Sequence, residues 1–351
     1  MNWLRRHLLS LIAASLLIGL GVSLWLSGPD LGRTLLSLPA WVLPLGFAMI
    51  VLGWNVNALR IRLLLAGQGI RTRHAKNLGV VMSTEFAHVA TPFGSGAPVT
   101  FVYLNQRRGV APTTSSAVFA VDQLFDMVFF LTTLPLLFVA LAGLPERMHV
   151  GAQITVMAVL LVTTLLLVSV AIRHYRWLIL ATARPLHALR LQPSSRRRLA
   201  RALMRFRLAV VTGLRMPARV LVSIYLLCAL HWLLRYGVLF VLIAAFSLTP
   251  SFAYVFFVQL VTMGLGQLSF LPGGAGTVEV GFSLLLGPLV PALYLGAVLF
   301  SWRLVTFYWY LLAGGVVFAI TAGYPLWKRF ATKPEDGPSS DPPEHQRGGN
   351  E

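Results

Sequence analysis

The chain has little negative charge and almost no cysteine. Only 11 of its 351 residues are Asp or Glu, and its one cysteine has no partner for an internal disulfide. The sequence also lacks a Cys and His cluster at metal-ligand spacing and a Gly-x-x-x-x-Gly-Lys-Ser/Thr nucleotide loop. We therefore expect no metal ion and no cofactor. With no nucleophile or metal set in the sequence, we also expect that the protein is not an enzyme.

The composition excludes a soluble nucleic-acid-binding protein, although a net charge of +18 and a pI near 11.3 are typical of that class. Hydrophobic residues make up 57% of the chain, charged residues make up 11%, and the mean hydropathy is +0.75. These values differ from those of soluble domains and are typical of a membrane protein. We expect no nucleic-acid partner, and the basic charge needs another explanation.

Six apolar runs are long enough to cross a hydrocarbon core of about 30 Å. With the N-terminus in the cytoplasm, all but four of the 29 Lys and Arg residues fall on the cytoplasmic side, including Arg60 in the loop after the second run. Arg33 and Arg147 fall outside, and Arg235 and Arg303 fall within the membrane. This asymmetry follows the positive-inside rule and predicts a multi-pass protein with both termini in the cytoplasm. The runs lie at 8–27, 40–59, 118–143, 150–172, 220–248 and 297–323.

Two Pro-Gly breaks interrupt the remaining apolar segments, and they lie 180 positions apart. Irregular backbone at membrane depth persists only where protein buries it or where it lines a cavity. Paired breaks in two halves of a chain indicate a transporter's binding site. The first break joins 78–91 to 97–105, between basic residues, and the second joins 251–271 to 277–290, without basic residues at either end. The break residues are Pro92, Gly94 and Gly96 in the first half, and Pro272, Gly273, Gly274 and Gly276 in the second.

Because the flanking charges differ, we interpret the breaks as two re-entrant hairpins that enter from opposite sides of the membrane. The predicted fold class is all-α and polytopic, with about six full spans, two re-entrant helical hairpins and an inverted-topology repeat. The flanks of the second break are long enough for two full spans, so about eight spans is the alternative. Coincidence between two glycine-rich kinks is the alternative to a repeat, since Gly and Pro are frequent in membrane helices.

The 180-residue offset also predicts the domain organisation. We expect one transmembrane domain over 1–330, with repeat units of about 40–143 and 220–323. The segment 173–219 carries twelve arginines and no acidic residue, and we interpret it as a basic cytoplasmic loop. Its part 194–214 has the pattern of an amphipathic helix that lies on an anionic leaflet, although a loop that only sets the topology would look the same. Residues 331–351 have the composition of a disordered cytoplasmic tail.

Six ionisable residues fall within the predicted membrane segments. A charge at the bilayer centre costs about 2.5–3.5 kcal/mol, so these side chains should meet at one interior site rather than face lipid. Asp122 and Asp126 are one helical turn apart on the same face, and we expect Arg235 and Arg303 to pair with them and with Glu279. The six are Glu85, Asp122, Asp126, Glu279, Arg235 and Arg303; all except Glu85, which lies nearer the cytoplasmic entry, form the predicted binding site.

Two other interpretations of these charges remain open. If Thr277 caps a helix after the second break, Glu279 sits in its first turn and stabilises the helix dipole, with no further role. Asp122, Asp126 and Arg235 could equally form structural pairs between helices.

Four motifs resemble the lysylphosphatidylglycerol synthase transmembrane-region family, also described as a flippase-like domain or a UPF0104-type membrane protein. The segment 271–279, Leu-Pro-Gly-Gly-Ala-Gly-Thr-Val-Glu, is similar to the family's Pro-Gly-Gly-x-Gly-x-x-Glu signature, and 302–309 is similar to its arginine-bearing last helix. Asp122 to Asp126 stands where the family has Glu-Arg-x-x-Asp. The first break, 92–97, keeps the frame of Pro-Gly-Arg-x-Gly-Glu but has neither the arginine nor the glutamate.

The resemblance, which covers about residues 5–330, implies a bacterial cell-membrane protein; if the cell is Gram-negative, this is its inner membrane. It implies translocation of a polar or anionic lipid between leaflets, with membrane lipids as partners. Since the chain ends in a short tail, we expect it to lack the aminoacyl-lipid transferase domain of some members. The alternative function is a non-transporting partner of a lipid-modifying enzyme or glycosyltransferase. The sequence does not determine the oligomeric state.

Overall fold

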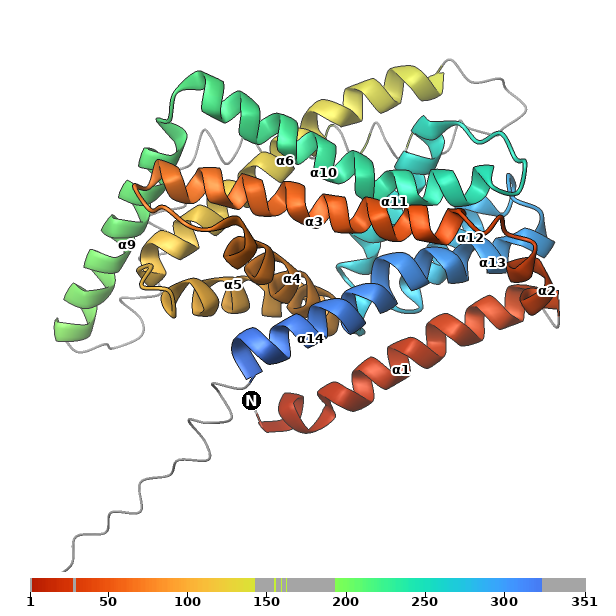
Figure 1. Cartoon of the computed structure of the whole chain (residues 1–351), viewed down its shortest axis with the longest axis horizontal. Helices are drawn as coiled ribbons and strands as arrows, with labels where there is room; N and C mark the ends of the chain where they lie inside the picture. Colours follow the sequence, from red (N-terminus) through yellow and green to blue (C-terminus); the bar gives the residue numbers. More distant parts are fainter. Residues whose placement is uncertain are drawn as a thin grey trace, which may run out of the picture.

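The computed structural model describes residues 2–27, 30–142 and 193–323, together with 155, 159 and 162, and this part of the chain contains helices and no strand. Four of the described helices are long and apolar enough to cross a membrane (Figure 1). They are α3 (Val42–Gly67), α6 (Pro112–Ala142), α10 (Ala218–Ala244) and the continuous helix Ala292–Ala322. The expectation of an all-α, polytopic protein is therefore confirmed.

The last of these spans is not a regular α-helix along its whole length. It begins as α13 (Ala292–Arg303) and continues through π-helical turns at η5 (Leu304–Tyr308) and η6 (Tyr310–Gly314). It then passes through α14 (Gly315–Phe318) into a further π-helical turn, η7 (Ala319–Gly323). Such π-turns are frequent at functional sites, and the first of them directly follows Arg303.

The first apolar run forms α1 (Asn2–Ser27), followed by the short α2 (Leu31–Leu36). Helix α1 packs along α13, at the lower edge of the molecule in Figure 1. The predicted span 150–172 and the predicted tail 331–351 lie outside the described residues, apart from the three isolated positions given above.

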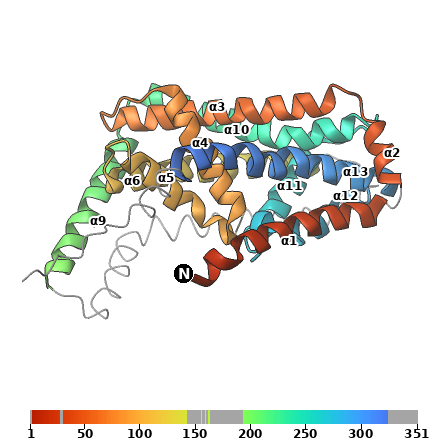
Figure 2. The same ribbon diagram turned by 60° about the horizontal axis from the view of Figure 1, so that its bottom comes forward.

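Helices α3 and α10 pack side by side and run in opposite directions (Figures 1 and 2). Gly46 near the start of α3 lies against Val238, and Gly53 further along lies against His231. Gly67 at the end of α3 lies against Met216, just before α10 begins. As the residue number rises on one helix it falls on the other, so these two equivalent spans are antiparallel. This antiparallel arrangement is what the inverted-topology repeat predicts.

The two breaks lie between short helices, as expected for re-entrant hairpins. The first hairpin consists of α4 (His74–Ala90), η2 (Pro92–Gly94) and α5 (Gly96–Gln106). The second consists of α11 (Phe252–Gly266), η4 (Pro272–Gly274) and α12 (Thr277–Leu286). At 15 and 10 residues, α11 and α12 are about 22 and 15 Å long. Neither can cross the hydrocarbon core, so the alternative of two full spans is wrong.

The two breaks begin with the same backbone turn at the 180-residue offset and then diverge, since Ser95 is helical (ψ −20°) and Ala275 is extended (ψ 141°). Each is a three-residue 3₁₀ turn with two consecutive left-handed residues: φ is 56° and 64° at Phe93 and Gly94, and 63° and 68° at Gly273 and Gly274. Left-handed backbone is unusual for a phenylalanine. Its presence at Phe93 shows that the position, rather than the residue type, determines the turn.

The two breaks meet in the middle of the molecule (Figure 1). Turns η2 and η4 are in contact, and the ring of Phe93 packs edge to face against that of Phe270, with centroids 5.6 Å apart. Two segments from opposite halves therefore share one site, and the buried residues around them, among them Trp54, Phe256 and Trp302, hold both hairpins between the long spans.

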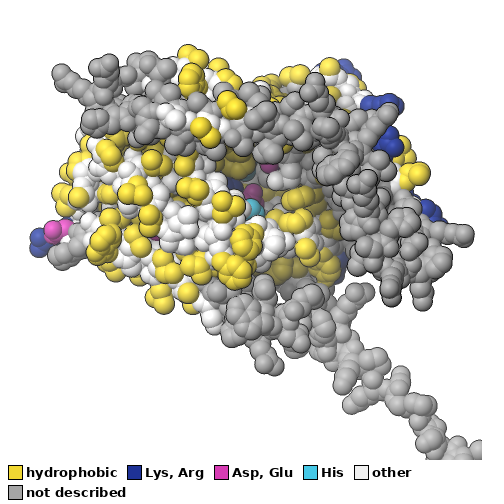
Figure 3. All heavy atoms as spheres, turned by 180° about the vertical axis from the view of Figure 1, so that it is seen from behind, with side chains coloured by type: hydrophobic (Ala, Val, Ile, Leu, Met, Phe, Trp, Pro, Cys, Tyr) yellow, Lys and Arg dark blue, Asp and Glu magenta, His cyan; other side chains and the backbone are white. Residues whose placement is uncertain are grey.

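The amphipathic helix expected in the basic segment is present as α9 (Pro193–Leu214). It packs against α6 and α3 near the end of the molecule where α3 ends, and Gln68 donates a hydrogen bond to the carbonyl oxygen of Ala209 (2.8 Å). In the view of Figure 3, Lys and Arg side chains gather mainly at one end of the molecule, and hydrophobic side chains cover the face between the ends.

Candidate functional site

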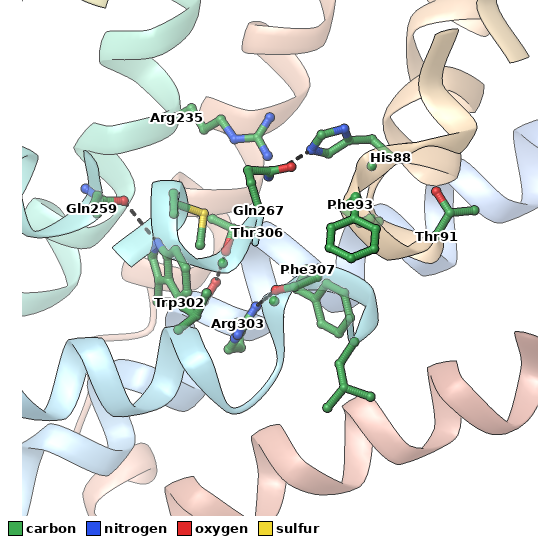
Figure 4. A pocket seen from close by; sticks show the side chains of 18 of the residues that line it. His88, Thr91, Phe93, Arg235, Gln259, Gln267, Trp302, Arg303, Thr306 and Phe307 are labelled. Carbon is green, nitrogen blue, oxygen red and sulfur yellow. Dashed lines mark hydrogen bonds between the residues drawn. The ribbon is translucent and has the colours of Figure 1, made fainter. Parts of the chain in front are cut away.

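A small cavity lies where the two hairpins meet (Figure 4). The first hairpin contributes His88, Thr91 and Phe93, and the second contributes Gln267, Gly273 and Gly274. Its volume of about 50 Å³ gives room for a few water molecules only. Further lining residues come from α10, α11 and the last span, and include Arg235, Gln259, Trp302, Arg303, Thr306 and Phe307.

Arg303 braces the second break from below the cavity. Its Nη1 donates to the carbonyl oxygen of Gly273 (2.8 Å), and its Nη2 lies 2.7 Å from Oε1 of Glu279. The other oxygen of Glu279 accepts the backbone N–H of Gly276 (2.7 Å). Glu279 therefore caps α12, as the dipole interpretation proposed, and also pairs with an arginine; both the arginine and the glutamate are almost completely buried.

Helix α1 packs against the pair of Arg303 and Glu279. A side chain at Gly19 of α1 would lie 3.4 Å from Oε1 of Glu279, so glycine at this position allows the two helices to approach closely. The Nε of Arg303 is buried without a hydrogen-bond partner among the described residues. Arg303, which lines the cavity, therefore has one N–H group that is not used in a hydrogen bond to the described residues.

Arg235 forms a second pair on the opposite wall. Its Nη1 lies 3.2 Å from Oε2 of Glu85 on α4, and its guanidinium carbon lies 4.9 Å from the ring centroid of Tyr310. About 15% of the Arg235 side chain is exposed, compared with 3% of the Arg303 side chain, so Arg235 is the more accessible cation. The expectation that Glu85 lies apart from the predicted site, nearer the cytoplasmic entry, is wrong, because it pairs with Arg235 and its side chain is only 16% exposed.

Polar side chains connect the walls of the cavity. Gln267 and His88 approach within 3.2 Å of each other above the cavity, beside Arg235 (Figure 4). Gln259 of α11 connects α10 to α13: it donates to the carbonyl oxygen of Tyr236 (2.7 Å) and accepts from Nε1 of Trp302 (3.2 Å). Together with the two arginines, these groups give the cavity mainly hydrogen-bond donors, which suit an anionic ligand.

Asp122 and Asp126 do not line this cavity. Both pair with Arg60 of α3: Oδ1 of Asp122 lies 2.6 Å from its Nε, and Oδ1 of Asp126 lies 2.7 Å from its Nη1. Asp126 also accepts hydrogen bonds from Trp232 and Cys228. The expected pairing of the two aspartates with Arg235 and Arg303 is therefore wrong, and the membrane charges form three separate clusters rather than one.

The placement of Arg60 in a cytoplasmic loop is also wrong. The residue lies within α3, and only 1% of it is exposed. The predicted apolar run ends at residue 59, but the helix continues through Ile61 and Leu64 to Gly67. Two signals in the sequence could have identified Arg60. One is this apolar continuation, and the other is the pair Asp122 and Asp126, one turn apart and without a cation of their own.

The two halves do not carry equivalent charges. By the 180-residue offset Arg235 corresponds to Asn55, whose Oδ1 lies 3.0 Å from Nε2 of His74 and which does not line the cavity. Arg303 corresponds to Gln123, which is exposed. Both cavity arginines therefore belong to the second half. Sequence reasoning also missed Gln259, Gln267 and Tyr310, since uncharged residues carry no comparable signal in a membrane helix.

Residues 12–314 match the family described as the lysylphosphatidylglycerol synthase TM region. The chain is also similar to a UPF0104 membrane protein of Archaeoglobus fulgidus, with 27% identity over 294 residues that cover 82% of this chain and 88% of that protein. The matched region contains both hairpins and all three charge clusters.

Proposed function

The chain belongs to the lysylphosphatidylglycerol synthase transmembrane-region family, and from this premise we propose that it moves a lipid with a polar, anionic headgroup between the two leaflets. In this proposal the headgroup passes between the two hairpins while its acyl chains stay in the surrounding lipid. The protein lies in the bacterial cell membrane, with its termini and the end that carries α9 in the cytoplasm.

One observation carries the proposal: two arginines face a cavity formed by broken helices from opposite halves of the chain. The N-terminal end of α12 adds a positive dipole end beside Arg303. Discontinuous helices with their N-termini directed at anionic groups are a recurrent design of transporter sites. Arg235 is the main headgroup contact in this proposal, since it is more exposed and holds its carboxylate at a longer distance.

The cavity must widen before it accepts a headgroup, because it has room for only a few water molecules. The contact between η2 and η4 is where the hairpins would separate, and the Phe93–Phe270 pair would part. Gln267 and His88 would then exchange their mutual contact for contacts with the headgroup.

The test is translocation of fluorescently labelled phosphatidylglycerol in proteoliposomes that contain the purified full-length protein. The variant Arg235→Gln with Glu85→Gln removes the cation while keeping the charge of the pair balanced, which limits the damage to folding. Loss of a charged hydrogen bond of about 1.5–3 kcal/mol should slow translocation about tenfold to a hundredfold. Arg303→Gln with Glu279→Gln provides the same test on the other wall.

The matched control is Arg62→Gln, which neutralises an exposed arginine near the end of α3 and should translocate at the wild-type rate. Equal rates in the wild type and in both paired variants would contradict the proposal. That outcome would favour the alternative role of a non-transporting partner, in which paired neutralisation leaves function unchanged.

A further inference from the structure

The cluster of Arg60, Asp122 and Asp126 lies outside the cavity, and its charges do not balance. One guanidinium faces two carboxylates, and 1% of Arg60 and 5% of Asp122 are exposed. With both aspartates ionised the cluster carries a net charge of −1 within the membrane-spanning helices α3 and α6. An uncompensated charge at that depth is costly, so the cluster needs one more positive charge.

The neighbouring titratable groups do not supply that charge. Helix α10 presents Cys228, His231 and Arg235 toward α3, α4 and α6, and α4 presents Glu85. The thiol of Cys228 is neutral and donates to Asp126 (3.2 Å), and Arg235 is already paired with Glu85. The ring Nδ1 of His231 lies 3.0 Å from the carbonyl oxygen of Gly53. A proton on the cluster itself is the simplest source of balance.

The two aspartates differ in how many donors they face. Asp126 accepts from Nη1 and Nη2 of Arg60 (2.7 and 3.4 Å), from Nε1 of Trp232 (2.9 Å) and from Sγ of Cys228. For Asp122, the one donor contact given by the described residues is the Nε of Arg60, which lies 2.6 Å from Oδ1. Because hydrogen bonds donated to a carboxylate favour its charged form, Asp126 is the aspartate that remains ionised.

We propose that Asp122 is a proton-binding site and that translocation is coupled to the proton held there. The proton comes from water, forms an O–H bond with Oδ2 of Asp122, the oxygen that is not in the ion pair with Arg60, and returns to water when that bond breaks; no electron is transferred. The coupling half of the proposal rests on the proposed function, whereas proton binding does not.

Trp232 connects this cluster to the cavity. Its Nε1 donates to Asp126, and the guanidinium carbon of Arg235 lies 5.6 Å from the centroid of its ring. Trp232 and Arg235 lie at i and i+3 on α10, and therefore on one face of that helix. When Asp122 loses its proton, the added negative charge acts through this contact on the cation that binds the headgroup. Protonation of Asp122 thereby changes how strongly Arg235 binds the lipid headgroup.

Infrared pH-difference spectra of the full-length protein in bilayers test proton binding directly. The wild type should show the carbonyl band of a buried carboxylic acid, which disappears as the pH rises. Asp122→Asn should remove the band, and so should Asp126→Asn, because either variant leaves Arg60 with one carboxylate. The control Glu279→Gln should keep it.

A wild-type spectrum without such a band, or an Asp122→Asn spectrum that retains it, would overturn the proton site. A titrating imidazolium signal that is lost in His231→Gln, with no carboxylic-acid band, would move the proton to His231 and also overturn it. If Asp122→Asn does not fold, Asp122→Glu replaces it: the carbonyl band should shift in frequency, and an unshifted band would overturn the proton site.

Coupling is tested with fluorescently labelled phosphatidylglycerol in proteoliposomes under an imposed pH gradient. One proton per lipid and one pH unit should give about a tenfold difference in probe between the leaflets. Asp122→Asn should still equilibrate the probe without a gradient but should not accumulate it. Translocation that ignores the gradient in the wild type overturns the coupling. Absence of any translocation refutes the proposed function, and the infrared result then stands by itself.

Discussion

At the scale of single residues, the chain compensates its few membrane carboxylates with arginines placed on other helices. Glu279 pairs with Arg303 and Glu85 pairs with Arg235, whereas Arg60 alone serves two aspartates. Removing one partner of a buried pair is far more damaging than removing an exposed charge, because it leaves the other charge without compensation.

Arg60 provides the sharpest test of this principle. We expect Arg60→Ala to destabilise the protein by about 3–5 kcal/mol, since it leaves two buried carboxylates without a cation. Thermal unfolding of the purified protein in detergent measures the effect. Arg62→Ala, two positions along the same helix but exposed, is the matched control and should change stability by about 0.5 kcal/mol or less. Similar unfolding midpoints for the two variants would show that the Arg60 cluster does not stabilise the fold.

At the scale of structural elements, the 3₁₀ turns η2 and η4 share two consecutive left-handed positions but differ in packing. The left-handed turn tolerates Phe93 in the first break, where the ring projects toward Phe270 and about half of it is exposed. In the second break the ring of Phe307 occupies the space that a side chain on Gly273 would need. Glycine is thus required at 273 for space as well as for its positive φ.

The two requirements can be separated by substitution. Gly69→Ala changes a glycine with a φ of 76° and no atom within 4 Å of the added carbon, so it should cost only the left-handed penalty of about 1–2 kcal/mol. Gly273→Ala has a similar φ of 63° but meets Phe307, and we expect about 1–3 kcal/mol more from overpacking. Unfolding midpoints of the two variants give the difference. Equal losses would mean that the ring of Phe307 moves freely and does not brace the break.

At the scale of the whole molecule, the two halves of the repeat carry different charges at equivalent positions. The offset of 180 relates the breaks and the long helices, but Arg235 and Arg303 correspond to Asn55 and Gln123. The second half therefore carries the cations of the cavity, while the first half supplies the carboxylate of Glu85 and the facing wall. The two halves thus supply matching broken helices, and unequal side chains place both cavity arginines in the second half.

The inverted topology predicts opposite labelling of two equivalent loops. Gln106 and Pro288 are exposed near the ends of α5 and α12, and the one native cysteine, Cys228, is buried. A membrane-impermeant maleimide added to intact cells should label Pro288→Cys and not Gln106→Cys, because cytoplasmic loops carry the excess of basic residues. Inside-out vesicles should give the reverse pattern, and labelling of both sites from one side would contradict the topology.

Much of the fold could be predicted from the sequence because a bilayer constrains the length of apolar segments and the placement of charged residues along the chain. Apolar runs, the asymmetry of basic residues and the spacing of two Pro-Gly breaks indicated the all-α class, the hairpins and the inverted repeat. The predicted end of α3 is the main difference from the structure, because the helix continues past the charged residue Arg60. A buried arginine is compatible with a membrane helix when a carboxylate on another helix faces it, and no local pattern reveals that partner.

By itself, therefore, the sequence determined where the described helices lie, which residues other than Arg60 carry charge into the membrane, and where the backbone breaks, because each of these depends on neighbours along the chain. Only the tertiary structure decided which charges meet. Arg60 and Asp126 are 66 positions apart, and Arg235 and Glu85 are 150 apart. Their pairing follows from how antiparallel helices pack, so one expected site became a cavity with two arginines and a separate cluster around Arg60.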